Sequence, residues 1–158
     1  MGIVINRPTD MTYEVLFEKI NVSLENSAIA NKPVLNGGPV QSERGFVLHP
    51  VGAETNVEWN SSITICDKTA LTTSKDILEA VALGVGPGKT LLTLGYAGWA
   101  SGQLEQEIAH NAWLSVQAKD TDTLNKILFE TPPEEQFNTT IALLGFDPAM
   151  LSGVAGHA

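Results

Sequence analysis

The stretch from residue 90 to residue 108 constrains the fold most, because it joins an apolar run, spaced glycines and a helix start. The run at residues 90–94 is typical of a buried strand, and the pattern after Gly102 is typical of a short amphipathic helix. Glycine permits positive φ and close approach of neighbouring backbone. We therefore predict a strand, a glycine-rich turn and a helix in succession, followed by a second strand at residues 113–116.

The rest of the chain mixes strand and helix patterns without regular alternation. Further strands are predicted at residues 1–5, 33–35, 45–49, 62–66 and 71–73. Pro8 is expected to end the first of them, because proline has no N–H for a ladder. Helices are predicted at residues 12–20, 75–83, 121–129 and 133–144, with a last short turn from Asp147. This order favours an α+β fold with a mixed sheet over a doubly wound parallel sheet.

Composition narrows the class of protein. The 158 residues suit one domain, residues 1–158, with a sizeable core. The net charge of −9 and the scattered basic residues argue against direct binding of nucleic acid. The sequence has no run long enough to span a bilayer and no secretory pattern. A single cysteine, Cys66, excludes an internal disulfide, so we expect a cytoplasmic protein without a membrane partner.

Four stretches carry a family resemblance: MGIVINRP at residues 1–8, NGGPV and RGFVLH within residues 36–49, GYAGW and GQLE within residues 95–105, and AGHA at residues 155–158. On these motifs the whole chain resembles the AlgH family of bacterial proteins, also known as YqgE. The resemblance implies an α+β fold with a bent, bifurcated sheet partly rolled into a barrel and helices outside. It also implies a regulatory role, described for one relative as transcriptional control of alginate synthesis. It supplies no catalytic residue and no cofactor.

The resemblance also implies a segment before residue 1, because family members usually carry one that pairs with the MGIVINRP stretch. Without that neighbour, residues 1–5 are expected to present an unpaired sheet edge, which is a common site of association between chains.

Two arginines are the first candidate ligand contacts. Basic residues are scarce in this chain, and two of them, Arg7 and Arg44, each border a glycine- or proline-rich turn. Gly37 and Gly38 belong to the turn before Arg44. A guanidinium beside free backbone N–H groups can hold a carboxylate or a phosphate. Alternatively, each arginine pairs with an acid or caps carbonyls and thereby fixes a loop.

The glycine-rich turn at residues 95–102 is the second candidate. Its spacing matches neither a dinucleotide fingerprint nor a P-loop. Tyr96 and Trp99 can line a pocket or stack on a ligand, or they can fill the core beneath the turn. We expect any functional site where this turn meets the loop at residues 36–44.

The helix after the turn carries Glu105, Glu107 and His110. A carboxylate and an imidazole can exchange protons or bind a metal, but such residues more often form a solvated helix face. His49 and His157 lack the spacing of a metal site, so no metal is expected. Cys66 is interpreted as a buried apolar residue.

These observations favour a regulatory or binding protein that acts through a protein partner or a small anionic ligand. The alternative is a small enzyme with an acid–base site near residues 95–107. A third possibility is a homodimeric interaction module, which would show an exposed apolar face or an unpaired edge at residues 1–5.

Overall fold

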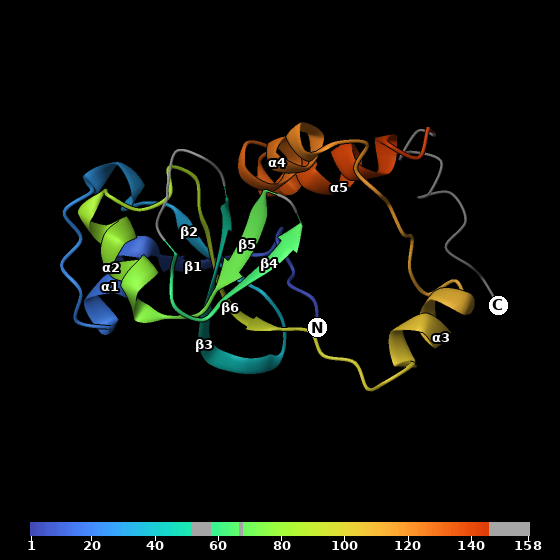
Figure 1. The fold of residues 1–158 in the computed structure, drawn as a ribbon, viewed down its shortest axis with the longest axis horizontal. Helices are drawn as coiled ribbons and strands as arrows, with labels where there is room; N and C mark the ends of the chain where they lie inside the picture. The colour runs from blue at the N-terminus through green and yellow to red at the C-terminus, as the bar shows by residue number, and fades with distance from the viewer. Residues whose placement is uncertain (52–57, 67, 146–158) are drawn as a thin grey trace. The chain divides into compact units, whose positions relative to one another are not determined.

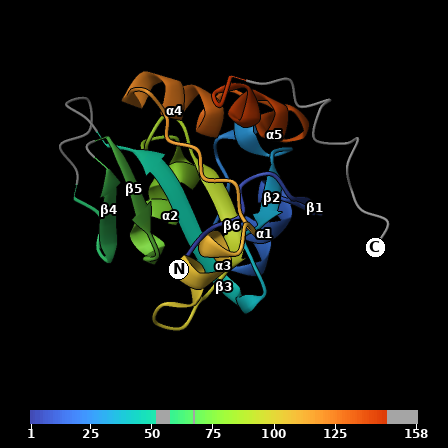
Figure 2. The same cartoon turned by 90° about the vertical axis from the view of Figure 1, so that its right-hand side faces the viewer.

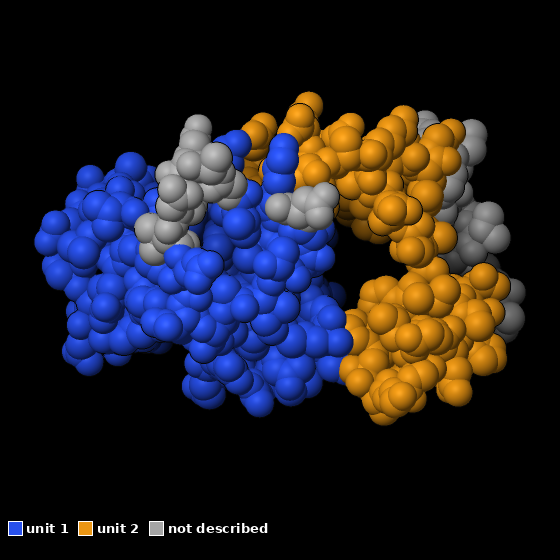
Figure 3. Space-filling model, viewed as in Figure 1, with its two compact units in different colours: residues 1–98 blue, residues 99–158 orange. Residues whose placement is uncertain are grey.

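The computed structural model describes residues 1–51, 58–66 and 68–145, so the predicted turn at Asp147 and the candidate His157 lie outside the described residues. The chain divides into two compact units, Met1–Gly98 and Trp99–Ala158 (Figure 3). The first unit contains a mixed six-stranded sheet and two helices, which confirms the α+β prediction. None of the helices within the described ranges is long and apolar enough to cross a membrane.

The sheet has the order β1-β2-β6-β3-β5-β4. Its strands are β1 (Pro8–Thr12), β2 (Pro33–Asn36), β3 (Val40–Pro50), β4 (Ser62–Cys66), β5 (Thr69–Thr72) and β6 (Leu91–Tyr96). The pair β2/β6 is parallel and the other pairs are antiparallel, which makes the sheet mixed. This sheet has β1 and β4 at its edges and is not closed into the partial barrel that the family resemblance implied.

The core of the first unit lies between one face of the sheet and two helices, α1 (Tyr13–Lys19) and α2 (Lys75–Leu83) (Figures 1 and 2). It consists of buried side chains from both layers: Tyr13, Phe17, Val34, Val47, Ile77, Val81, Ala82 and Leu92. The Tyr13 hydroxyl donates to the carbonyl of Thr90 at 3.2 Å and accepts the N–H of Leu92 at 2.9 Å. This buried hydroxyl therefore ties α1 to the start of β6.

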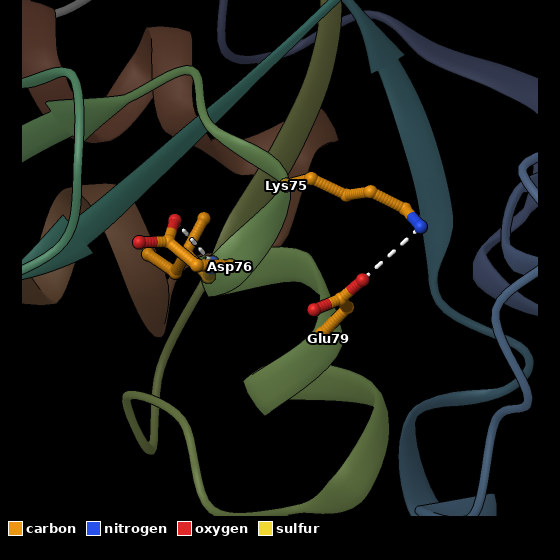
Figure 4. A network of polar contacts seen from close by, with 4 residues as sticks. Lys75, Asp76 and Glu79 are labelled. Carbon is orange, nitrogen blue, oxygen red and sulfur yellow. Dashed lines mark hydrogen bonds and ion pairs between the residues drawn. The ribbon is translucent and has the colours of Figure 1, made fainter.

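Local signals fixed both helices of this unit. Thr12 caps α1 by accepting the N–H of Val15, and Gly84 ends α2 in the left-handed region at φ 77°. At the start of α2, Asp76 accepts the N–H of Ile77, while Lys75 forms an ion pair with Glu79 at 3.1 Å (Figure 4). A short 3₁₀ turn, Ser27–Ile29, lies in the predicted loop between α1 and β2.

The second unit contains α3 (Gln103–Ala109), α4 (Thr121–Phe129) and α5 (Pro133–Ala142). The buried amide of Gln136 on α5 donates to the carbonyls of Ile127 and Leu128 at 3.0 and 3.4 Å. It thereby supplies donors to carbonyls near the end of α4, which lack partners in a helix that stops there. Asp120 caps α4 by accepting the N–H of Thr123. Pro133 occupies the first turn of α5, a position that suits proline.

Two predicted strands are wrong. Residues 1–5 form a single bridge, Gly2 with Ala97, and the first strand begins at Pro8 instead of ending before it. Pro8 is tolerated there because it is the first residue of an edge strand. The expected unpaired edge is also wrong, since Gly2 pairs with Ala97 and Val4 donates to the carbonyl of Gly37 at 2.9 Å. Residues 113–116 form no strand.

Candidate functional site

The loop after β2 and the end of β6 lie in direct contact, as the sequence predicted. A Cβ atom on Gly37 would lie 2.4 Å from the carbonyl oxygen of Gly95, and one on Gly38 would lie 2.2 Å from the carbonyl carbon of Tyr96. No side chain fits at those distances. The Gly37 N–H donates to the carbonyl of Leu94 at 2.8 Å, and the Gly38 N–H donates to Asn36 Oδ1 at 3.1 Å. The first bond joins the two segments, and the second lies within the loop after β2.

Arg44 lies beyond this contact, on β3, and its guanidinium is held by neutral groups. Nη1 donates to Gln41 Oε1 at 3.4 Å, and Nη2 donates to Thr73 Oγ1 at 3.3 Å. The guanidinium carbon lies 5.6 Å from the centre of the Phe46 ring, which is a cation–π distance. No carboxylate pairs with Arg44 among the residues that the structure describes.

An open cavity of about 350 Å³ adjoins Arg44 in the first unit. Its walls come from the start of β3, from the segment that leads into β4, from β5 and from the end of β6. The lining residues are Met1, Gln41, Arg44, Phe46, Ser61, Ser62, Ile63, Leu71, Thr73 and Tyr96. The rings of Phe46 and Tyr96 meet edge to face at 5.7 Å. The lining therefore combines the guanidinium of Arg44 with aromatic, aliphatic and hydroxyl groups, and none of the described lining residues is acidic.

Two lining residues adopt backbone conformations that are uncommon for their side chains. Gln41 has φ 50° and Ser61 has φ 51°, both in the left-handed region. Such residues persist only where the surrounding structure holds them, and they cluster at binding sites. Gln41 follows the first residue of β3 and Ser61 immediately precedes β4, so the cavity has a strained residue on two of its walls.

Arg7 is exposed and does not line this cavity. Its carbonyl accepts the N–H of Asn36 at 2.8 Å, which links the segment before β1 to the end of β2. The structure thus places Arg44 and Tyr96 in the lining of one cavity. Gly37 and Gly38 pack against the end of β6 and do not line the cavity. Arg7 also lies outside the lining.

The remaining predicted residues belong to the second unit. Glu107 on α3 accepts the indole N–H groups of Trp99 and Trp113 on Oε2, at 3.0 and 2.7 Å, and the amide of Gln103 on Oε1 at 2.9 Å. The two indole rings meet edge to face at 5.8 Å. These hydrogen bonds, that of Trp113 first, hold the pKa of Glu107 below its usual range. Glu105 is exposed.

The histidines are dispersed. His49 is buried, with Nδ1 3.1 Å from the carbonyl oxygen of Pro50 and Nε2 2.9 Å from Thr72 Oγ1. Because a carbonyl can only accept, Nδ1 donates, and Nε2 of the neutral ring accepts from Thr72. Burial lowers the pKa of His49 and keeps the ring neutral. His110 is exposed, and no group of three metal-ligating side chains occurs within the described ranges.

Most of the cavity lining was missed by sequence reasoning. Phe46 could have been found, because it stands two residues after Arg44 on one strand and therefore shares its face. Ser61 lies immediately before β4 and Thr73 immediately after β5, and no local pattern brings them to Arg44. The role of Trp113 was also missed. Residues 113–116 were predicted to form a strand, whereas the indole of Trp113 donates to Glu107. Cys66 is only partly buried, against the expectation of a buried residue.

The fold and this cavity define an α+β protein with a mixed open sheet that carries an amphiphilic pocket. The AlgH-like family model matches residues 1–149, and the chain belongs to this family. A UPF0301 protein from Bordetella petrii is 55% identical over 159 residues, covering 100% of this chain and 74% of the relative. One from Ralstonia nicotianae is 52% identical, covering 100% and 78%.

A solved structure extends the likeness. The solution structure of the AlgH protein from Pseudomonas aeruginosa matches with a TM-score of 0.74 and 43% identity, covering 100% of this chain and 79% of that protein. A crystal structure of a protein from Corynebacterium diphtheriae, 17% identical, shares the fold with a TM-score of 0.54, covering 76% and 60%.

Proposed function

We propose that this protein is a non-enzymatic, regulatory or binding protein of the cytosol that takes a small anionic ligand in the cavity beside Arg44. One observation carries the proposal. Acidic residues outnumber basic ones by 18 to 9, yet the guanidinium of Arg44 faces only neutral groups in its cavity. In so acidic a chain, an arginine that has no carboxylate partner among the described residues leaves a charge for a ligand to neutralise.

The cavity supports a binding role in other ways. Its size lies within the range of small-molecule sites, which combine apolar walls with few polar groups. The strained backbone at Gln41 and Ser61 fixes two of its walls before a ligand arrives. Such a ligand could switch the protein between states that a partner distinguishes.

The acid–base enzyme has less support. The cavity contains no carboxylate, histidine or cysteine that could transfer a proton. Glu107 makes three hydrogen bonds that favour its ionised form, which weakens it as a base, and both ring nitrogens of His49 are engaged.

A protein partner and a homodimer stay predictions. The edge strand β4 offers the surface that either would need, because Ile63 is 63% and Ile65 57% exposed. Both side chains lie beside unpaired backbone groups of the sheet edge.

A thermal-shift series tests the anion site. The full chain is melted in acetate, phosphate, sulfate and a set of organic carboxylates at constant ionic strength, beside the Arg44→Gln variant. We expect at least one anion to raise the Tm of the wild-type chain but not that of the variant, because a ligand stabilises only the state that binds it. Equal shifts in both proteins, or none in either, would refute the proposal.

A further inference from the structure

We infer that the ligand of the Arg44 cavity is a monocarboxylate with an apolar body about the size of an aromatic ring, an inference that rests on the proposed function. Three properties carry it: the net negative charge of the protein, the shape of the Arg44 guanidinium and the chemistry of the cavity walls.

The net charge of the protein favours a monoanion. Arg44 is the only cationic side chain among the described lining residues, and Met1, whose α-amino group is also cationic, belongs to the same lining. A dianion such as a phosphate monoester would bring two negative charges beside a protein of net charge −9. The field of such a protein repels multiply charged anions.

The guanidinium favours an anion that offers two acceptor oxygens side by side. Its five N–H donors form a rigid fork that matches the two oxygens of a carboxylate, and it binds phosphate in the same way, so the charge of the ligand must separate the two classes. The present bonds to Gln41 and Thr73 are long, at 3.4 and 3.3 Å, and each acceptor is neutral. A carboxylate would replace them with shorter, charge-assisted bonds, after which the hydroxyl of Thr73 can itself donate to the ligand.

The walls select an apolar body. The aromatic rings of Phe46 and Tyr96 meet edge to face, and the lining residues Ile63 and Leu71 are cross-strand partners on one face of the sheet. The side chain of Ile63 is 63% exposed, so a ligand body in the cavity would remove apolar surface from water. Acetate or another small anion would satisfy Arg44 and leave this surface uncovered.

Four probes separate these requirements in NMR titrations of the full chain at neutral pH. Phenylacetate has the carboxylate and the ring, acetate lacks the ring, 2-phenylethanol lacks the charge, and phenyl phosphate carries the ring on a dianion. We expect phenylacetate to bind at least about 10-fold more tightly than each of the other three, a difference of about 1.4 kcal/mol. Its shifts should centre on the backbone amides of Arg44, Ile63, Thr73 and Tyr96.

Two variants locate the site. Arg44→Gln should weaken phenylacetate about 10- to 100-fold, the loss expected for charge-assisted hydrogen bonds. Lys68→Gln changes the net charge equally at an exposed residue outside the cavity and should leave the affinity unchanged. Both variants are compared by their amide spectra, so that a folding defect is recognised.

The outcomes separate the two proposals. If acetate or phenyl phosphate binds as tightly as phenylacetate, and Arg44→Gln abolishes that binding, the monocarboxylate class is wrong and the anion site stands. If no probe shifts the cavity amides, the class is also wrong. A thermal-shift series that then shows no anion dependent on Arg44 removes the proposed function as well.

Discussion

At the scale of single residues, His49 shows how burial sets a pH dependence. Its ring lies within the sheet, bonded to Thr72 and to the carbonyl of Pro50, and burial lowers its pKa from the ordinary 6.5. A histidine whose pKa is depressed on folding binds more protons when unfolded. Its contribution to stability is therefore complete above about pH 6.5 and is lost as the pH falls toward the lower folded-state value.

We therefore expect the urea midpoint of the wild-type chain to fall between pH 7.5 and pH 5.5, the range in which histidine titrates. His49→Gln keeps a donor and an acceptor and should flatten this dependence, whereas His110→Gln removes only an exposed ring and should not. If the urea midpoint of His49→Gln depends on pH as strongly as that of the wild-type chain, His49 is not the source of the pH dependence.

The second prediction at the scale of single residues concerns Gly38. It has φ 150°, and an added Cβ would lie 2.2 Å from the backbone of Tyr96. Gly38→Ala is expected to destabilise the protein by more than about 2 kcal/mol, because backbone strain and displacement add. Gly88→Ala is the matched control, since nothing lies within 4 Å of its Cβ position. Equilibrium unfolding in urea should show a loss for the first and little change for the second.

At the scale of elements, the start of α2 places two carboxylates in contrasting roles (Figure 4). Asp76 accepts the backbone N–H and the side-chain amide of Asn60, at 3.0 and 2.9 Å, and thereby joins the helix to the segment before β4. The pKa of Asp76 is lowered first by its bond from Ser74. Glu79 makes only the exposed ion pair with Lys75.

Asp76→Ala should therefore cost about 1 to 2 kcal/mol of stability, and Glu79→Ala no more than about 0.5 kcal/mol. The free energy of unfolding from urea titrations checks the difference. Equal losses in the two variants would show that the Asn60 connection adds nothing.

The short helix α3 gives a prediction that depends on Glu107. Hydrogen bonds from Trp113, Gln103 and Trp99 lower its pKa, so the arrangement is favoured above the ordinary value of 4.5 and is lost as the pH falls through the lower folded-state value. In a Trp59→Phe background, only Trp99 and Trp113 contribute tryptophan emission.

We expect that emission to change with a midpoint below pH 4.5, and Glu107→Gln to show the altered emission already at neutral pH. Glu105→Gln removes a neighbouring exposed carboxylate and should behave as the parent does. A transition retained in Glu107→Gln would assign it to another group.

At the scale of the whole molecule, burial is unevenly distributed. The first unit has a contiguous core that joins α1, α2 and the sheet. In the second unit, α4 and α5 bury Ile127, Leu128 and Ile141, whereas α3 buries no residue. Elements with few buried contacts open at low free-energy cost.

Hydrogen exchange should follow this distribution. Amides of β3 and β6 are expected to exchange only through extensive unfolding, and those of α3 to exchange orders of magnitude faster. Mass spectrometry of peptic fragments of the full chain makes the comparison. Equal protection of α3 and β6 would contradict it and would require a partner surface for α3.

The sequence alone determined the structural features whose causes are local. The end of α2 follows from a left-handed Gly84 after it, and the start of α5 follows from Pro133. The mixed α+β class follows from the irregular order of strands and helices. The contact between residues 36–44 and the glycine-rich turn also followed from their glycines, because only glycine allows backbones so close.

Tertiary structure decided the features that depend on distant partners. Pro8 begins a strand because it falls on the edge strand β1, a position that its own residue type does not reveal. Trp113 binds Glu107 instead of continuing a strand. Arg44 acquires Thr73 and Tyr96 as neighbours only through the order β6-β3-β5 of the sheet. Strand order depends on contacts between residues that are far apart in the sequence. Local propensity therefore does not reveal which strands become neighbours.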